Sequence, residues 1–182
     1  GEATDGAGAD GPELPARFQF SIKTFTGRYL PVEDRLRLDS VDVEGAEQCI
    51  LLTRRLCNKL IPTIATQLEE KLPEGMPRDV AQDMRQSSAR QARSATATES
   101  PVVAGSASPT WLCVTVHIKK LPSGEFVVVF TDGRSIDASM GMAEANFRAV
   151  LDVFHELYVK AEWSSECFPD WFDRPILVQA GE

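Results

Sequence analysis

The alternation of hydrophobic and polar residues predicts several short strands in the first third of the chain. From Phe18 onward, apolar side chains occupy every second position, which is the period of a half-buried strand. A turn is expected at Thr26 and Gly27, and Pro31 favours a sheet edge or a bulge for the strand that follows. The strands expected in this block cover residues 18–22, 28–32 and 35–43.

A helical period replaces the alternation from about Glu44. Apolar residues then recur at the spacing of one buried stripe, and Pro62 is expected to interrupt this helix and to begin a second segment or a kinked extension. Residues 73–110 are rich in serine, alanine, proline and glycine, with almost no large apolar side chain after Met84. This composition predicts a long linker that is disordered over most of its length.

A second block of strands begins at Trp111. An Asp-Gly hairpin turn is expected before the last of three strands, and a helix from about Gly141 to Glu162. Starting at Phe147, this helix has apolar residues at i, i+3, i+4, i+7, i+10, i+11 and i+14. One of its faces is therefore continuously apolar, and the helix is expected to pack on a sheet.

The two blocks share the order strand, turn, strand, strand, helix. Shifting the sequence by 97 residues aligns them without a gap from Thr26 and Ser123 to Ile61 and Tyr158, with chance similarity of two β-rich units as the alternative. Each unit is too small to bury its own core, whereas two units can cover one another. The sequence therefore predicts an α+β fold in which two pseudo-repeats of antiparallel β-strands, each followed by one helix, combine into a single domain. The expected parts are an acidic disordered tail, a first repeat, a flexible linker, a second repeat and an aromatic C-terminal extension, at residues 1–15, 16–72, 73–110, 111–162 and 163–182.

Composition and charge narrow the classes of function. The net charge of -8 argues against phosphate binding over the whole surface but leaves room for a local positive face. The four cysteines lack C-x-x-C spacing and are expected to be free thiols in a reducing compartment, and two histidines are too few for a zinc site, so no metal or cofactor is expected. No apolar run suits a membrane span and no signal-peptide pattern is visible. An intracellular protein without membrane contact is expected, with mitochondrial and nuclear or cytoplasmic locations both open.

Motifs of known catalytic sites are absent from the sequence. There is no Gly-rich phosphate loop, no G-x-S-x-G and no H-E-x-x-H. Asp132, Gly133 and Asp137 are explained as turn and cap residues. The chain is therefore expected not to be an enzyme.

Two segments resemble a known repeat. The first two strands of a PUR repeat, the module of the purine-rich single-strand-binding proteins, are similar to FQFSIKTFTGRYL and, in length, to VTVHIKKLPSGEFVVV. The related Whirly fold of organellar single-strand binders and guide-RNA chaperones has the same duplicated plan of four strands and a helix. The resemblance covers residues 17–62 and 111–161. It implies two intertwined repeats that bind single-stranded RNA or DNA.

The PUR pattern places a lysine, a glycine and a stacking aromatic ring on its first hairpin. The lysine corresponds here to Lys23 and Lys119, and the ring to Tyr29 and Phe126. An ammonium group for a phosphate and a flat ring for a base can bind single strands without strict sequence preference. The candidate nucleic-acid-binding residues are Lys23, Arg28, Tyr29, Lys119, Lys120 and Phe126. Alternatively, the rings pack in the core and the charges are ordinary solvated strand ends.

A second function follows from the positions at which the PUR pattern is not matched. Its asparagine is replaced by Phe25 and Leu121, and its arginine by Thr26 and Ser123. With the acidic net charge, this favours a non-catalytic scaffold or assembly subunit of a larger complex, such as one that processes RNA. The expected partners are thus single-stranded nucleic acid, RNA rather than DNA, and other protein chains or further copies of this one.

The C-terminal extension is unusually rich in large rings. Trp163, Phe168, Trp171 and Phe172 either fold back as a cap on the sheet or dock another chain. Residues 176–178 are expected to add a strand.

Overall fold

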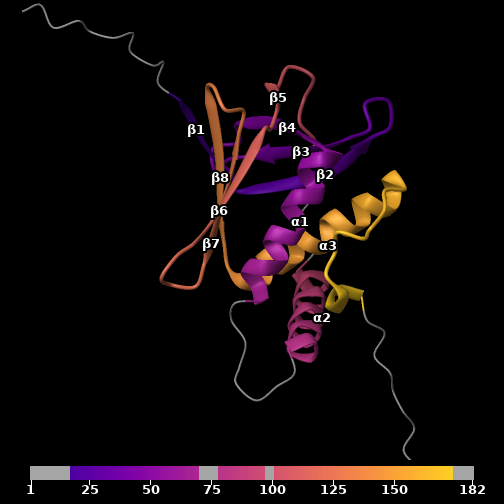
Figure 1. Ribbon diagram of the computed structural model, residues 1–182. Helices are drawn as coiled ribbons and strands as arrows, with labels where there is room; N and C mark the ends of the chain where they lie inside the picture. Colours follow the sequence, from indigo (N-terminus) through magenta and orange to yellow (C-terminus); the bar gives the residue numbers. More distant parts are fainter. Residues whose placement is uncertain (1–16, 70–77, 97–100, 174–182) are drawn as a thin grey trace, which may run out of the picture.

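Two four-stranded β-sheets and three α-helices make up the part of the chain that the computed structural model describes, residues 17–69, 78–96 and 101–173 (Figure 1). The strands are β1 (Phe18–Ser21), β2 (Thr24–Leu30), β3 (Arg35–Val41), β4 (Glu47–Thr53), β5 (Thr110–Leu112), β6 (Thr115–Lys120), β7 (Phe126–Thr131) and β8 (Ile136–Met142). The helices are α1 (Arg54–Glu69), α2 (Arg78–Thr96) and α3 (Glu144–Ala161), and a short 3-10 helix, η1, covers Asp170–Asp173. The predicted α+β class is confirmed. None of these helices has the length and hydropathy that crossing a membrane requires.

Each sheet combines three antiparallel strands from one half of the chain with one parallel strand from the other half. In the first sheet the order is β2-β3-β4-β5, and β5 runs parallel to β4 with Thr110 opposite Cys49. In the second sheet the order is β1-β8-β7-β6, and β1 runs parallel to β8 with Phe18 opposite Ile136. The two halves of the chain therefore interlock, because each supplies a strand to the sheet of the other.

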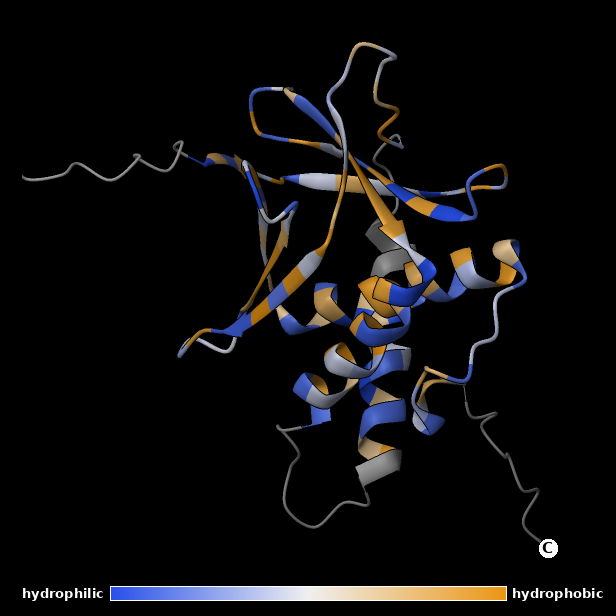
Figure 2. Ribbon diagram, turned by 45° about the horizontal axis from the view of Figure 1, so that its top comes forward, coloured by the Kyte–Doolittle hydropathy of each residue, from blue (hydrophilic) through white to orange (hydrophobic). Residues whose placement is uncertain are grey.

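The hydrophobic core lies between the inner faces of the two sheets and the helices α1 and α3. In Figure 2 orange and blue segments alternate along the strands, as expected when one face is buried and the other is exposed. The ring of Phe126 stacks on Phe147 of α3, with ring centroids 4.2 Å apart. A Cβ atom at Gly27 would come within 2.7 Å of Leu157 Cδ1, so this glycine allows α3 to lie against β2. The long apolar helix predicted to pack on a sheet is thus confirmed as α3.

The strand predicted from Trp111 is divided in two. Residues 113–114 separate β5 from β6, because the chain passes from one sheet to the other there, and residues 22–23 mark the same passage between β1 and β2. The turn predicted at residues 26–27 is wrong, since both lie within β2. The alignment shifted by 97 residues is also wrong, because it places Tyr29 of the edge strand β2 on Phe126 of the central strand β7.

The helix predicted from about Glu44 is wrong over its first part. Glu47–Thr53 is the strand β4, and α1 begins only at Arg54. The apolar run at residues 49–52 suits a strand covered on both faces as well as a helix, and periodicity cannot separate the two over so few residues. Pro62 does not divide the helix, because α1 continues through it.

The linker predicted over residues 73–110 contains the 19-residue helix α2, which packs against α3 away from the sheets (Figure 1). Its buried side chains are alanines and glutamines rather than large apolar residues. Gln86 Nε2 donates a hydrogen bond to the backbone oxygen of Arg148 at 2.8 Å, and Arg148 Nη2 donates one to Gln82 Oε1 at 2.6 Å. The prediction of disorder is wrong for this segment, because small and polar side chains hold it in place.

The rings of the C-terminal extension fold back onto the helices. Trp163, Trp171 and Phe172 are each at most 5% exposed, and Phe168 is half-buried. The indole nitrogen of Trp171 donates to Glu69 Oε1 of α1 at 2.9 Å. Trp163 also packs edge-on against Tyr29 of β2, with ring centroids 5.9 Å apart. The buried rings are therefore not available to dock another chain, and the cap that they form covers helices and the edge of the first sheet. The predicted tail at residues 1–15 and strand at residues 176–178 lie outside the described residues.

All four cysteines are free thiols, as predicted. Iodoacetamide at pH 8 is expected to modify Cys167 first, because it is half-buried whereas the others are at most 2% exposed. Burial also raises the pKa of Cys113 to about 11, which leaves little reactive thiolate at pH 8. Mass spectrometry of peptides after timed labelling would give the order. Equal labelling rates at all four positions in the folded protein would contradict this burial.

Candidate nucleic-acid interface

The outer face of the first sheet carries three arginines on neighbouring strands. Arg28 of β2 lies directly opposite Arg37 of β3, and Arg35 precedes Arg37 by two positions and shares its face. We call these three residues the arginine cluster. Like charges directly opposite each other destabilise a sheet, so the cluster needs an anion close by.

A buried carboxylate, Asp39, meets this need for two of the three arginines. Arg37 Nε donates to Asp39 Oδ1 at 2.5 Å, and Arg28 Nη2 lies 2.9 Å from Asp39 Oδ2. The hydrogen bond with Asp39 raises the pKa of Arg37 above its ordinary value, so the guanidinium stays charged. Since two cations share one carboxylate, one positive charge remains uncompensated.

The arginine cluster remains accessible to solvent. The side chains of Arg28, Arg35 and Arg37 are 42%, 37% and 21% exposed. Arg35 lies 3.8 Å from Glu33, which is too long for a strong hydrogen bond. The cluster therefore presents N–H groups to any ligand that brings oxygen acceptors, as a phosphate does.

The opposite end of the same face is covered by the segment that leads into β5. The backbone N–H of Gly105 and the hydroxyl of Ser108 both donate to Glu47 Oε2, at 2.8 and 2.7 Å. The Ser108 bond in particular lowers the pKa of Glu47. Only the end with the arginine cluster is therefore left open.

The predicted lysines lie apart from the arginine cluster. Lys119 is exposed on the outer face of the second sheet, where His117 of the same strand accompanies it. Lys23 is exposed between β1 and β2, and its backbone N–H donates to the oxygen of Val41. Of the six predicted residues, the structure brings Arg28 alone into the arginine cluster.

The two predicted stacking rings lie on the inner faces of their sheets. Phe126 is 2% exposed, so the prediction that it stacks on a base is wrong. Tyr29 is half-buried, and its hydroxyl donates to Asp34 Oδ1 at 2.8 Å while its ring packs edge-on against Trp163. Lys120 has its ammonium group 5.8 Å from the centre of the Phe126 ring. These three residues thus support the fold rather than an exposed surface.

Sequence reasoning missed Arg35 and Arg37, although their signal was present. The run RLRL at residues 35–38 alternates arginine with leucine, and the strand was predicted from those leucines. Since Leu36 and Leu38 are fully buried, the two arginines must share the opposite, outer face.

A metal site finds no support in the part of the chain that the structure describes. Among the residues with described positions, no group of three or more histidine, cysteine, aspartate or glutamate side chains is placed to hold a metal ion. The arginine cluster is thus the best-defined candidate site for an anionic ligand. Comparison with known protein families, curated proteins and solved structures gave no match to this chain.

Proposed function

We propose that the chain is a single-stranded nucleic-acid-binding module, with RNA rather than DNA as its ligand, whose arginine cluster binds backbone phosphates. The observation that carries this proposal is the pair of arginines facing each other around one shared carboxylate, Asp39. Guanidinium groups form paired hydrogen bonds with phosphate oxygens. The open surface of the sheet is also wide enough for an extended single strand of nucleic acid to lie across it.

The proposal includes a PUR-like or Whirly-like arrangement of two repeats. Strands β1–β4 followed by α1, and strands β5–β8 followed by α3, have the same order. The first strand of each unit pairs in parallel with the last strand of the other. This exchange supports the intertwined repeats that the resemblance implies, and α2 is then an insertion between them.

Binding at this surface rests on charge rather than on stacking. The outer faces of the described strands carry no phenylalanine, tyrosine or tryptophan. Contacts to phosphates hold a nucleic-acid strand in place but do not distinguish one base from another. We therefore expect weak sequence preference and a strong dependence of affinity on salt.

Replacing Arg28 with alanine is expected to weaken binding of a fluorescent single-stranded oligoribonucleotide by about tenfold at low salt, the effect of losing one charged hydrogen bond. Asp39 keeps its contact with Arg37 in this variant, so the fold is retained. Anisotropy titrations at several salt concentrations should also show a slope of log K against log salt that is reduced by about 0.7 per lost phosphate contact.

Arg134→Ala provides the matched control. Arg134 is exposed in the turn between β7 and β8, far in sequence from the arginine cluster, and its loss removes the same formal charge. An equal loss of affinity in this variant would show that net charge, not the cluster, determines binding. Absence of any binding at low salt by the folded protein would reject the proposed function.

The second candidate function is that of an acidic scaffold or assembly subunit with the same fold. The net charge of -8 and the lack of rings on the outer strand faces favour it. A folded protein that ignores the oligonucleotide but forms a defined complex with another chain would support this function instead.

A further inference from the structure

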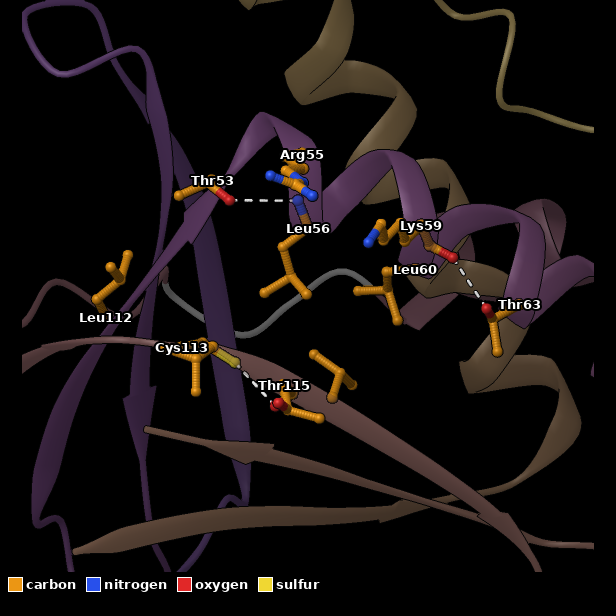
Figure 3. A pocket seen from close by; sticks show the side chains of 11 residues that line it. Thr53, Arg55, Leu56, Lys59, Leu60, Thr63, Leu112, Cys113 and Thr115 are labelled. Atoms are coloured by element: carbon orange, nitrogen blue, oxygen red, sulfur yellow. Dashed lines mark hydrogen bonds between the residues drawn. The ribbon is translucent and has the colours of Figure 1, made fainter. Parts of the chain in front are cut away.

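A groove of about 480 Å³ lies where α1 passes over the crossing from β5 to β6 (Figure 3). This volume falls within the range of about 300 to 1,000 Å³ that is typical of small-molecule sites. The N-terminal half of α1 forms one side of the groove, and residues 112–116 form the other. Its apolar lining comes from Leu56, Leu60, Leu112, Cys113, Val114 and Val116.

Two exposed apolar side chains, Leu112 and Val114, form the edge of the groove, which we call its lip. Leu112 is 36% exposed and Val114 is 53% exposed, whereas Leu60 and Cys113 are buried at the base. Exposing large aliphatic side chains to water at the mouth of an apolar groove costs free energy, which is recovered when a ligand covers them. The lining contains no aromatic ring, so a stacked base is not the ligand it suits.

The charges along the groove are all positive. Arg55 and Lys59, one helical turn apart on α1, are the charged residues that line it, and both are exposed. Neither forms an ion pair with any residue whose position is described. Figure 3 shows both cations on α1 beside the aliphatic side chains of Leu56 and Leu60.

The length of the groove limits the size of the apolar part of its ligand. Leu56, the first apolar residue of the lining on α1, and Thr63, the last lining residue of this helix, are separated by about 10 Å at about 1.5 Å per helical residue. An extended chain advances about 3.5 Å for every three bonds. A chain of about eight to ten carbons therefore matches the groove.

We propose that this groove binds a single-chain amphiphilic anion. The alkyl chain lies along Leu56, Leu60 and Val116, and a carboxylate or phosphate headgroup is held by Arg55 and Lys59. This function is independent of nucleic-acid binding, because it uses another surface and adds an apolar contact that the arginine cluster lacks. The arrangement satisfies both halves of the ligand, since its apolar carbons leave water and its headgroup meets two cations that pair with no carboxylate among the described residues.

Calorimetric titration of the full chain with decanoate, below its micelle concentration, tests this proposal. We expect saturable binding with one site per chain. Decylammonium should bind at least about tenfold more weakly, because Arg55 and Lys59, which form the rim of the groove, repel its positive charge. Decyl phosphate distinguishes the two headgroups: tighter binding than decanoate would assign the site to phosphate monoesters, and weaker binding to carboxylates. No saturable binding of either anion, or equal binding of decylammonium, would overturn the proposal.

Variants at the rim and the lip connect the binding to this groove. Arg55→Gln with Lys59→Gln should weaken decanoate at least about tenfold, and Val114→Glu should do the same by placing a negative charge at an exposed position. Lys160→Gln, at an exposed site on α3, is the matched control. Arg28→Ala should leave decanoate binding unchanged, so failure of this proposal and failure of the nucleic-acid proposal are distinguishable. Unaltered binding in both the rim and lip variants would place the ligand elsewhere.

Discussion

Replacing Phe126 with alanine is expected to lower the free energy of unfolding by about 3 to 5 kcal/mol, the usual cost of emptying the space of a buried phenylalanine. The Phe126 ring is 2% exposed and stacks on Phe147, so the substitution leaves a cavity between β7 and α3. Urea denaturation followed by tryptophan fluorescence would measure the change. Under conditions in which the variant is folded, its affinity for an oligonucleotide should equal that of the unaltered chain.

Phe18→Ala is the control, because it removes the same side chain from a position that is 55% exposed. Its effect should stay below about 1 kcal/mol, as for most surface substitutions. A Phe126→Ala protein with undiminished stability and lost oligonucleotide binding would falsify the structural role and restore the predicted stacking role.

Replacing Arg148 with alanine should cost about 3 kcal/mol and release α2 from the rest of the protein, because it removes the cationic partner of a buried network. Arg148 is 1% exposed, and its Nη2 donates to Gln82 Oε1 at 2.6 Å and to Glu144 Oε1 at 2.9 Å. Its guanidinium also lies 5.7 Å from the ring centre of Trp171. Hydrogen exchange of the α2 amides should accelerate far more than that of the strands.

Arg134→Ala, at an exposed turn, controls for loss of an arginine as such. The double variant Arg148→Met with Glu144→Met should recover part of the stability, since it removes both charges of the buried pair. The recovery is only partial because Arg85, which is more exposed, also loses its 3.1 Å contact with Glu144. Faster exchange spread evenly over both sheets, with α2 no more affected than β7, would count against this local role.

The parts of the fold that could be predicted are those with a strong local pattern. The helix α3 was evident because its apolar residues recur over four turns, and β3 because its leucines alternate with polar residues. The helix α2 has alanines in place of most of the large apolar residues at this spacing, so its buried face looks like the composition of a linker. Gln82 and Gln86 each contact Arg148, across 66 and 62 positions of the chain, and no short window of sequence contains both ends of such a contact.

The candidate site was predicted less well, for a geometric reason. Alternation shows which residues share a face of a strand, but not which face a ligand meets. Arg28 and Tyr29 are neighbours in β2 and so lie on opposite faces, as do Lys119 and Lys120 in β6. A single surface could never contain both members of either pair. The arginine cluster became visible only once the pairing of β2 with β3 was known.

The exchange of strands between the two halves has a consequence for the order in which the protein is assembled. Gln19 of β1 reaches its neighbour Asp137 of β8 across 118 positions of sequence. On a ribosome adding about 5 to 20 residues per second, β1 waits for roughly 6 to 24 seconds before β8 has even been made. Phe18 and Phe20 stay without their sheet during that time, open to chaperones and to other nascent chains. Of the described strands, β1 is therefore the first to be synthesised, and yet it pairs with the one that is synthesised last.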